Sequence, residues 1–143
     1  MIPVLLALSL QQKVSLSETL LSGVADNAET VRVQYKITHV EDKVTRECIA
    51  QRLLLLDIIL RISISLDDEV KRAKESDTVI VDSDIRKLDV ARSKSFELRE
   101  QALMCRFGLA KGSVTTRMIQ TAEDLVDTPT DPPSVEVPEA SPN

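Results

Sequence analysis

The stretch that decides the fold is residues 24–107, which read VADNAETVRVQYKITHVEDKVTRECIAQRLLLLDIILRISISLDDEVKRAKESDTVIVDSDIRKLDVARSKSFELREQALMCRF. It contains neither glycine nor proline, the two residues that most often mark turns and breaks. Sheets need tight turns, and those turns usually contain glycine. The stretch therefore predicts long helices joined by turns built from Asp, Asn and Ser.

The apolar spacing and the remaining glycines predict where these helices begin and end. Gly23 is expected to end the first helix as a C-cap, and Ser65 is expected to cap the third, with a break near 77–84. The expected helices cover residues 3–22, 28–62, 66–107 and 113–126. Together they predict an all-α fold, a helical hairpin or a small bundle of three to five helices with coiled-coil-like packing.

Two stretches favour an α+β domain instead. Residues 31–40 alternate between apolar and polar side chains, as a half-buried strand does, and residues 78–81 are a run of mostly β-branched residues bounded by acids. We prefer the helical interpretation because the apolar face of 31–40 continues in helical steps through Val44 and Cys48.

The apolar content is sufficient for a core, but it is almost entirely aliphatic. Hydrophobic residues make up 43% of the chain and aromatic residues 2%, namely Tyr35, Phe96 and Phe107. Leu, Ile and Val must therefore form the core, which suits helix-on-helix packing. The scarcity of aromatic rings argues against a protein that stacks nucleic-acid bases.

Charge separates the end of the chain from its body. All 18 Lys and Arg residues lie at or before Arg117, whereas six acids and no base follow from Glu123 onward. Residues 127–143 are rich in proline and acid, so they cannot bury enough apolar area to offset the entropy of ordering. We expect a helical domain over 1–126 and a disordered acidic tail over 127–143.

No segment is expected to span a membrane. The apolar residues 1–10 lack a preceding basic residue, which argues against a secretory signal, and they are shorter than the ~20 residues of a spanning helix. The densest apolar run, 53–62, is interrupted by Asp57 and Arg61.

The two cysteines predict a reducing compartment. Cys48 and Cys105 lie far apart in the sequence, and two cysteines are too few for a disulfide framework in a chain of 143 residues. We therefore expect two buried thiols and a cytoplasmic protein.

No constellation in the sequence indicates catalysis. His39 is the only histidine, and no nucleophile motif accompanies it. Asp82 and Asp84 resemble a magnesium-binding pair, but a helix start explains them as well. Residues 108–113 depart from the phosphate-loop pattern in their glycine spacing. We expect no enzyme, no cofactor and no metal.

The leading functional hypothesis is a helical scaffold that binds its own copies or the helices of a partner. Residues 53–62 present apolar side chains nearly all round the helix, more than packing against one neighbour requires. The residues expected to be buried or to face a partner are Leu53, Leu55, Ile58, Ile59 and Ile62.

The alternative is a small nucleic-acid-binding protein. The segment 86–117 carries a net charge of +5, and Arg92, Arg99 and Arg106 recur at seven-residue intervals. On a helix these arginines form one stripe that suits the phosphates of a polyanion. A solvated helix face explains the same charges.

Overall fold

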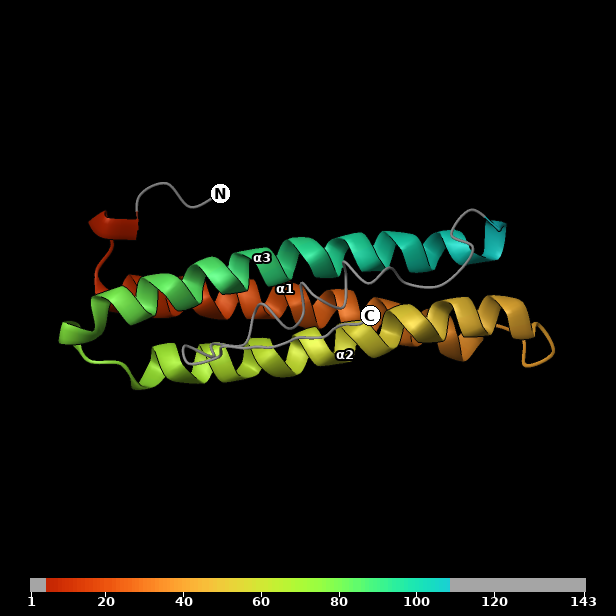
Figure 1. The fold of residues 1–143 in the computed structure, drawn as a ribbon, viewed down its shortest axis with the longest axis horizontal. Coiled ribbons are helices and arrows are strands. Elements are labelled where there is room, and N and C mark those ends of the chain that lie inside the picture. The colour runs from red at the N-terminus through yellow and green to blue at the C-terminus, as the bar shows by residue number, and fades with distance from the viewer. Residues whose placement is uncertain (1–4, 109–143) are drawn as a thin grey trace, which may run out of the picture.

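The computed structural model describes residues 5–108, which form three long helices packed side by side (Figure 1). The helices are α1 (Leu10–Ile37), α2 (Lys43–Arg72) and α3 (Thr78–Met104). Short 3-10 turns occupy Leu5–Ala7, Glu75–Asp77 and Cys105–Phe107. α2 runs antiparallel to α1 and α3, and every helix contacts both others. This confirms the all-α bundle.

Within residues 5–108 no strand is present, and helices take up 90% of the structure. Neither of the two stretches that favoured an α+β domain forms a strand. Residues 31–37 are the end of α1, and residues 78–81 are the first turn of α3. The predicted helix 113–126 and the tail 127–143 lie outside the described residues.

Local capping explains where α1 and α2 begin. The Ser9 hydroxyl accepts a hydrogen bond from the Gln12 amide (3.2 Å), and the Gln12 side chain accepts one from the Ser9 amide (2.8 Å). This reciprocal capping box satisfies two amides that the first helical turn leaves unpaired. At α2, the Asp42 carboxylate accepts a hydrogen bond from the Thr45 amide (3.2 Å).

The predicted boundaries at Gly23 and Ser65 are wrong, because both residues lie inside long helices. α1 passes through Gly23 without a left-handed residue there and continues to Ile37, since the next residue, Val24, is fully buried. The stem of Arg92 lies over Gly23, at a point where a Cβ atom would be 2.9 Å from Arg92 Cδ. Burial against the neighbouring helices therefore outweighs the local signal for a stop. Gly108, with φ of 72°, is a left-handed cap at the end of the 3-10 turn Cys105–Phe107.

Buried residues recur in alternating steps of four and three along each helix. We call these sets the three seams. The seam of α1 is Lys13, Ser17, Leu20, Val24, Asn27 and Val31. The seam of α2 is Thr45, Ile49, Arg52, Leu56, Ile59, Ser63, Leu66 and Val70. The seam of α3 is Val81, Asp84, Leu88, Ala91, Ser95, Leu98, Ala102 and Cys105. This spacing keeps one side of each helix facing its neighbours along the whole bundle.

Small residues in or beside the seams let the helices approach closely. Those less than 2% exposed are Ser17, Ala28, Ser63, Ala91, Ser95 and Ala102. Between them, aliphatic side chains such as Leu56, Ile59 and Leu98 fill the interior. A core without large aromatic rings can therefore still reach the dense packing of protein interiors.

Leu54 and Leu56 test this description of the core, because they are two residues apart on α2 but one side chain is exposed and the other is buried. Leu56 is 0% exposed and Leu54 is 61% exposed. We expect Leu56→Ala to lower the free energy of unfolding by about 2–5 kcal/mol, since it leaves a cavity. Leu54→Ala should change it by no more than about 0.5 kcal/mol. Urea unfolding followed by circular dichroism measures both, and equal losses would contradict the assigned faces of α2.

Candidate functional site

Two of the five predicted partner-binding residues belong to the core of the bundle, and the other three pack against it. Leu55 and Ile59 are buried at 6% and 1% exposure, whereas Leu53, Ile58 and Ile62 are partly buried against the core. The expectation that 53–62 is a buried region is thus correct for Leu55 and Ile59. A partner can reach only the three partly buried residues.

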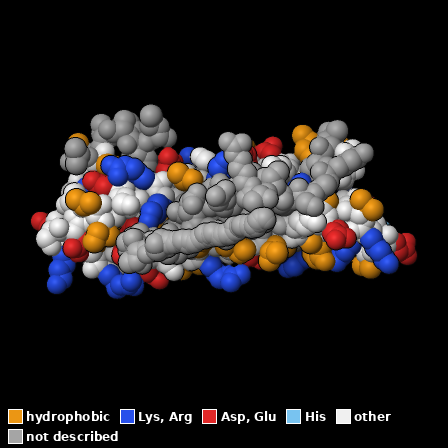
Figure 2. All heavy atoms as spheres, in the orientation of Figure 1, with side chains coloured by type: hydrophobic (Ala, Val, Ile, Leu, Met, Phe, Trp, Pro, Cys, Tyr) orange, Lys and Arg blue, Asp and Glu red, His pale blue; other side chains and the backbone are white. Residues whose placement is uncertain are grey.

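Of the five large apolar side chains that are more than 61% exposed in the described part of the chain, Val79 lies at the start of α3, and the other four lie at the opposite end of the bundle, at the turn between α1 and α2 and at the end of α3. These four are Ile37, Val40, Val44 and Phe107, at 66%, 71%, 83% and 62% exposure. We call this set the apolar end. Figure 1 shows the turn and the end of α3 at the same end of the bundle. In Figure 2, hydrophobic side chains also line the part of α2 that leads to this turn.

The turn at the apolar end is held by one arginine. Nη1 of Arg46 donates to the carbonyl oxygens of Thr38 (3.0 Å) and Tyr35 (3.3 Å), and its guanidinium lies over the Tyr35 ring at 4.2 Å. These contacts satisfy carbonyl groups at the end of α1, where a cation is also favoured by the helix dipole. Arg46 therefore fixes the turn that joins three members of the apolar end, Ile37, Val40 and Val44.

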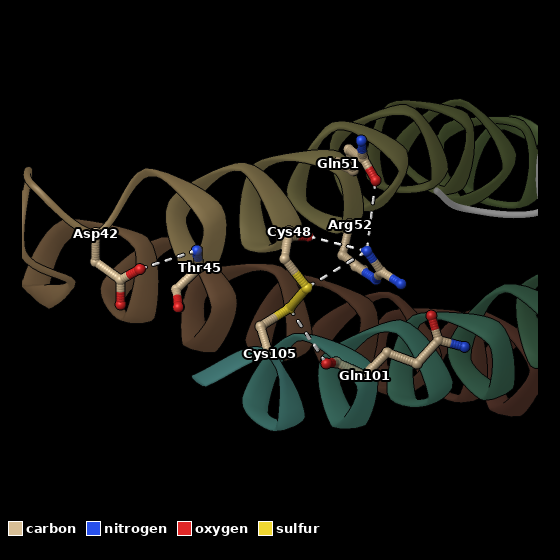
Figure 3. Close-up of a disulfide and its surroundings, with 7 residues drawn as sticks. All are labelled: Asp42, Thr45, Cys48, Gln51, Arg52, Gln101 and Cys105. Carbon is tan, nitrogen blue, oxygen red and sulfur yellow. Dashed lines mark hydrogen bonds between the residues drawn. A yellow bond between two sulfur atoms is a disulfide. The ribbon is translucent and has the colours of Figure 1, made fainter. Parts of the chain in front are cut away.

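Cys48 and Cys105 form a disulfide that joins α2 to the end of α3 (Figure 3). The prediction of two free thiols is wrong. The cysteines are 57 residues apart in the sequence, but the antiparallel packing of α2 and α3 brings their Cα atoms to 5.9 Å. Val44 precedes Cys48 by one helical turn, and Phe107 follows Cys105 by two residues. The disulfide therefore links the parts of α2 and of the chain after α3 that carry these two members of the apolar end.

Arg52 lies beside the disulfide. Its Nη1 is 3.6 Å from the Cys48 sulfur and 3.2 Å from the Cys48 carbonyl oxygen. The residue is only 4% exposed, and this burial lowers the pKa of Arg52 from its ordinary value. The site thus places a desolvated cation against one sulfur of the pair.

Arg92 and Arg99 lie two turns apart on α3, Arg106 lies in the 3-10 turn that follows, and acids lie beside the first two. Arg92 pairs with Asp89 (3.9 Å) and Arg99 pairs with Glu100 (2.9 Å). Arg106 stacks on Phe107, with the guanidinium 5.2 Å from the ring centre.

A shallow groove beside Arg92 adds further negative charge, because Glu18 and Asp26 of α1 line it. These carboxylates weaken the attraction that Arg92 would exert on a phosphate. Lys111 and Arg117, which belong to the same basic segment, lie outside the described residues.

Polar pairs cross the interior and connect α1 to both other helices. Lys13 Nζ is 2.8 Å from Asp82 Oδ1 of α3, with both side chains at most 7% exposed. The Ser17 hydroxyl donates to Asp67 of α2 (2.6 Å), and the Asn27 amide donates to Ser95 of α3 (2.8 Å). Sequence reasoning missed these pairs because the partners lie 50 to 69 residues apart and no local pattern links them.

Lys71 joins this network at the surface. Its ammonium group lies 3.0 Å from Asp67 and 3.3 Å from Glu18. The hydrogen bond to Asp67, followed by that to Glu18, raises the pKa of Lys71 above its ordinary value. The negative charge of the buried Asp67 is therefore balanced by a cation that stays in contact with water.

The other candidate groups are not brought together. His39 lies exposed in the turn between α1 and α2. Across residues 5–108 no group of three or more His, Cys, Asp or Glu side chains is arranged to hold a metal ion. In the same part of the chain, no helix has the length and apolarity needed to cross a membrane.

Comparisons with protein-family models, curated proteins and solved structures found no match to this chain.

The buried pair of Lys13 and Asp82 can be tested by removing one partner and then both. Lys13→Met leaves a carboxylate in the interior without its cation, and we expect a loss of about 3–5 kcal/mol in the free energy of unfolding. The double variant Lys13→Met/Asp82→Leu should recover most of that loss. Denaturant unfolding of the wild type and both variants measures the difference, and a single variant as stable as the wild type would exclude a structural role for the pair.

Proposed function

We propose that this chain is a non-enzymatic helical interaction protein that binds a second copy of itself through the apolar end. The observation that carries the proposal is the gathering of Ile37, Val40, Val44 and Phe107, each more than 60% exposed, at one end of the bundle. Exposed apolar side chains that gather at one end of a molecule are typical of an interaction site.

The charges around the apolar end favour a second copy over a partner of strong charge. Residues 36–47 contain three basic and three acidic side chains, namely Lys36, Lys43, Arg46, Glu41, Asp42 and Glu47, and Arg106, which stacks on Phe107, adds one further positive charge. In a dimer with a two-fold axis, the charged side chains around the apolar end of one copy face the same side chains of the other copy. Because both signs are present there, opposite charges can pair across the contact. A polar rim that carries both signs and little net charge therefore suits self-association.

The contact can extend along α2 beyond the turn. Ile58 follows Val44 by two seven-residue repeats, so both lie on the same side of α2, and Ile62 lies one turn further. Leu53 lies on the other flank, one turn before Asp57, which pairs with Arg32 of α1 (2.8 Å). Of the predicted partner-binding residues, the partly buried Ile58 and Ile62 would contact the second copy. The buried Leu55 and Ile59 would support them from the core.

The proposed compartment remains the cytoplasm, although the disulfide overturns the two free thiols from which the sequence predicted it. Cytosolic thiols are kept reduced, so a disulfide formed there is transient rather than permanent. A permanently oxidised pair in cells would instead favour a secreted or otherwise oxidising setting.

Polyanion binding through the basic segment is the second candidate. The exposure of Arg92 and Arg106 on one stripe favours it. We rank it below self-association because Asp89, Glu18 and Asp26 lie beside Arg92.

Val44 and Val79 give a matched test of self-association. They are the same residue type at 83% and 82% exposure, but Val79 lies at the start of α3, at the opposite end of the bundle. We expect the wild type to self-associate in sedimentation equilibrium and Val44→Asp to weaken the association at least about tenfold, or ~1.4 kcal/mol. Val79→Asp should leave it unchanged. A monomeric wild type, or equal effects of both variants, would contradict the proposal.

A salt series separates the two candidates. Association through aliphatic side chains should change little between low and moderate salt, whereas binding to phosphates weakens steeply as salt rises. We expect no measurable binding of the full chain to a generic RNA at low salt. Binding that is lost on adding salt, and that Arg92→Gln/Arg106→Gln reduces, would favour the polyanion candidate instead.

A further inference from the structure

We propose that Cys48 and Cys105 are a reversible thiol–disulfide pair, with Cys48 as the nucleophilic cysteine and Cys105 as the resolving one. The pair would exchange with low-molecular-weight thiols and their disulfides. The inference is drawn from the surroundings of the two sulfurs (Figure 3) and does not depend on self-association.

The first observation is the cation at Cys48. Arg52 Nη1 lies 3.6 Å from the Cys48 sulfur, and the guanidinium belongs to a residue that is 4% exposed. In the disulfide the sulfur is neutral and gains little from this contact. When the disulfide is reduced, a Cys48 thiolate would place a full negative charge beside a desolvated cation. Such a contact favours the thiolate over the thiol.

The second observation is the different setting of Cys105. Its sulfur lies 3.5 Å from the Gln101 carbonyl oxygen, which can accept a hydrogen bond only when the sulfur carries a proton. In the disulfide there is no such proton. Cys105 also lies at the end of α3, where the helix dipole disfavours negative charge. The reduced pair is therefore asymmetric, with a thiolate favoured at Cys48 and a thiol at Cys105.

The exposure of the two cysteines also favours Cys48 as the nucleophilic cysteine and Cys105 as the resolving one. Cys48 is partly exposed, whereas Cys105 is 5% exposed. An external reagent can reach Cys48 first, and the sheltered Cys105 lies within bonding distance to complete the reaction. Thiolate character together with access is what distinguishes a reactive cysteine from a structural one.

The exchange is balanced in two steps. The Cys48 thiolate attacks a small disulfide RSSR, which forms a Cys48–SR mixed disulfide and releases RS⁻. Cys105 then loses its proton to solvent and attacks the Cys48 sulfur, which forms the Cys48–Cys105 bond and expels a second RS⁻. The two cysteines are oxidised and one RSSR is reduced to two thiols. Reduction of the protein follows the same steps in reverse.

The test compares two full-length variants that each retain one cysteine. Alkylation rates over a pH series should give Cys48, in Cys105→Ser, a pKa below the ordinary value of about 8.5. Cys105, in Cys48→Ser, should show no such lowering and should react more slowly. If Cys105 is the faster of the two, or if Cys48 titrates with an ordinary or raised pKa, the proposal is overturned.

Arg52 is tested in the Cys105→Ser background. Arg52→Met should raise the pKa of Cys48 and slow its alkylation at neutral pH by roughly threefold to tenfold, whereas Arg52→Lys should retain much of the effect. Arg46→Met is the matched control, because Arg46 packs on Tyr35 at the same end of the bundle and donates to backbone carbonyls there. Equal rates for the Arg52→Met and Arg46→Met variants would exclude a role for Arg52.

A final measurement uses the unmodified protein and needs no folded variant. The native disulfide should be reduced by a small thiol without denaturant, and it should re-form when the corresponding disulfide is added. A disulfide that resists millimolar small thiols until the protein is unfolded would be purely structural and would contradict the proposal.

Discussion

Lys13, Ser17 and Asn27 lie on the buried side of α1, and each must meet a polar partner because an unpaired polar group in the interior is costly. Their partners are Asp82, Asp67 and Ser95. These contacts are satisfied together only when α3 packs parallel to α1 at one offset and α2 packs against both in the opposite direction. The aliphatic seams alone would tolerate a shift by one seven-residue repeat, whereas the polar pairs would not.

The disulfide and the apolar end follow from this register. With α3 fixed against α1, its last turn lies beside the second turn of α2, and Cys105 meets Cys48. The same register places the turn between α1 and α2 beside Phe107, where apolar side chains stay exposed. One set of buried contacts thus positions both the reactive pair and the surface that we propose for self-association, although the two proposals rest on separate observations.

The sequence predicts the presence of the long helices better than the residues at which they begin and end. The absence of glycine and proline over 24–107 correctly predicts long helices, and the dense run at 53–62 correctly predicts buried residues at Leu55 and Ile59. The stop at Gly23 is wrong because burial of Val24 is a tertiary effect. The disulfide and the polar pairs could not be predicted, since each depends on the register between helices and no local pattern encodes it.

We expect the buried polar pairs to select one register of the three helices. The direct measurement is a two-dimensional amide NMR spectrum of a chain in which the three pairs are replaced by apolar residues of similar size, recorded beside the wild type. If the pairs select the register, the wild type gives one peak per structured amide, and the apolar chain stays helical but gives additional or broadened peaks from several arrangements. A single sharp set of peaks from the apolar chain, with an unchanged mass in solution, would contradict the account.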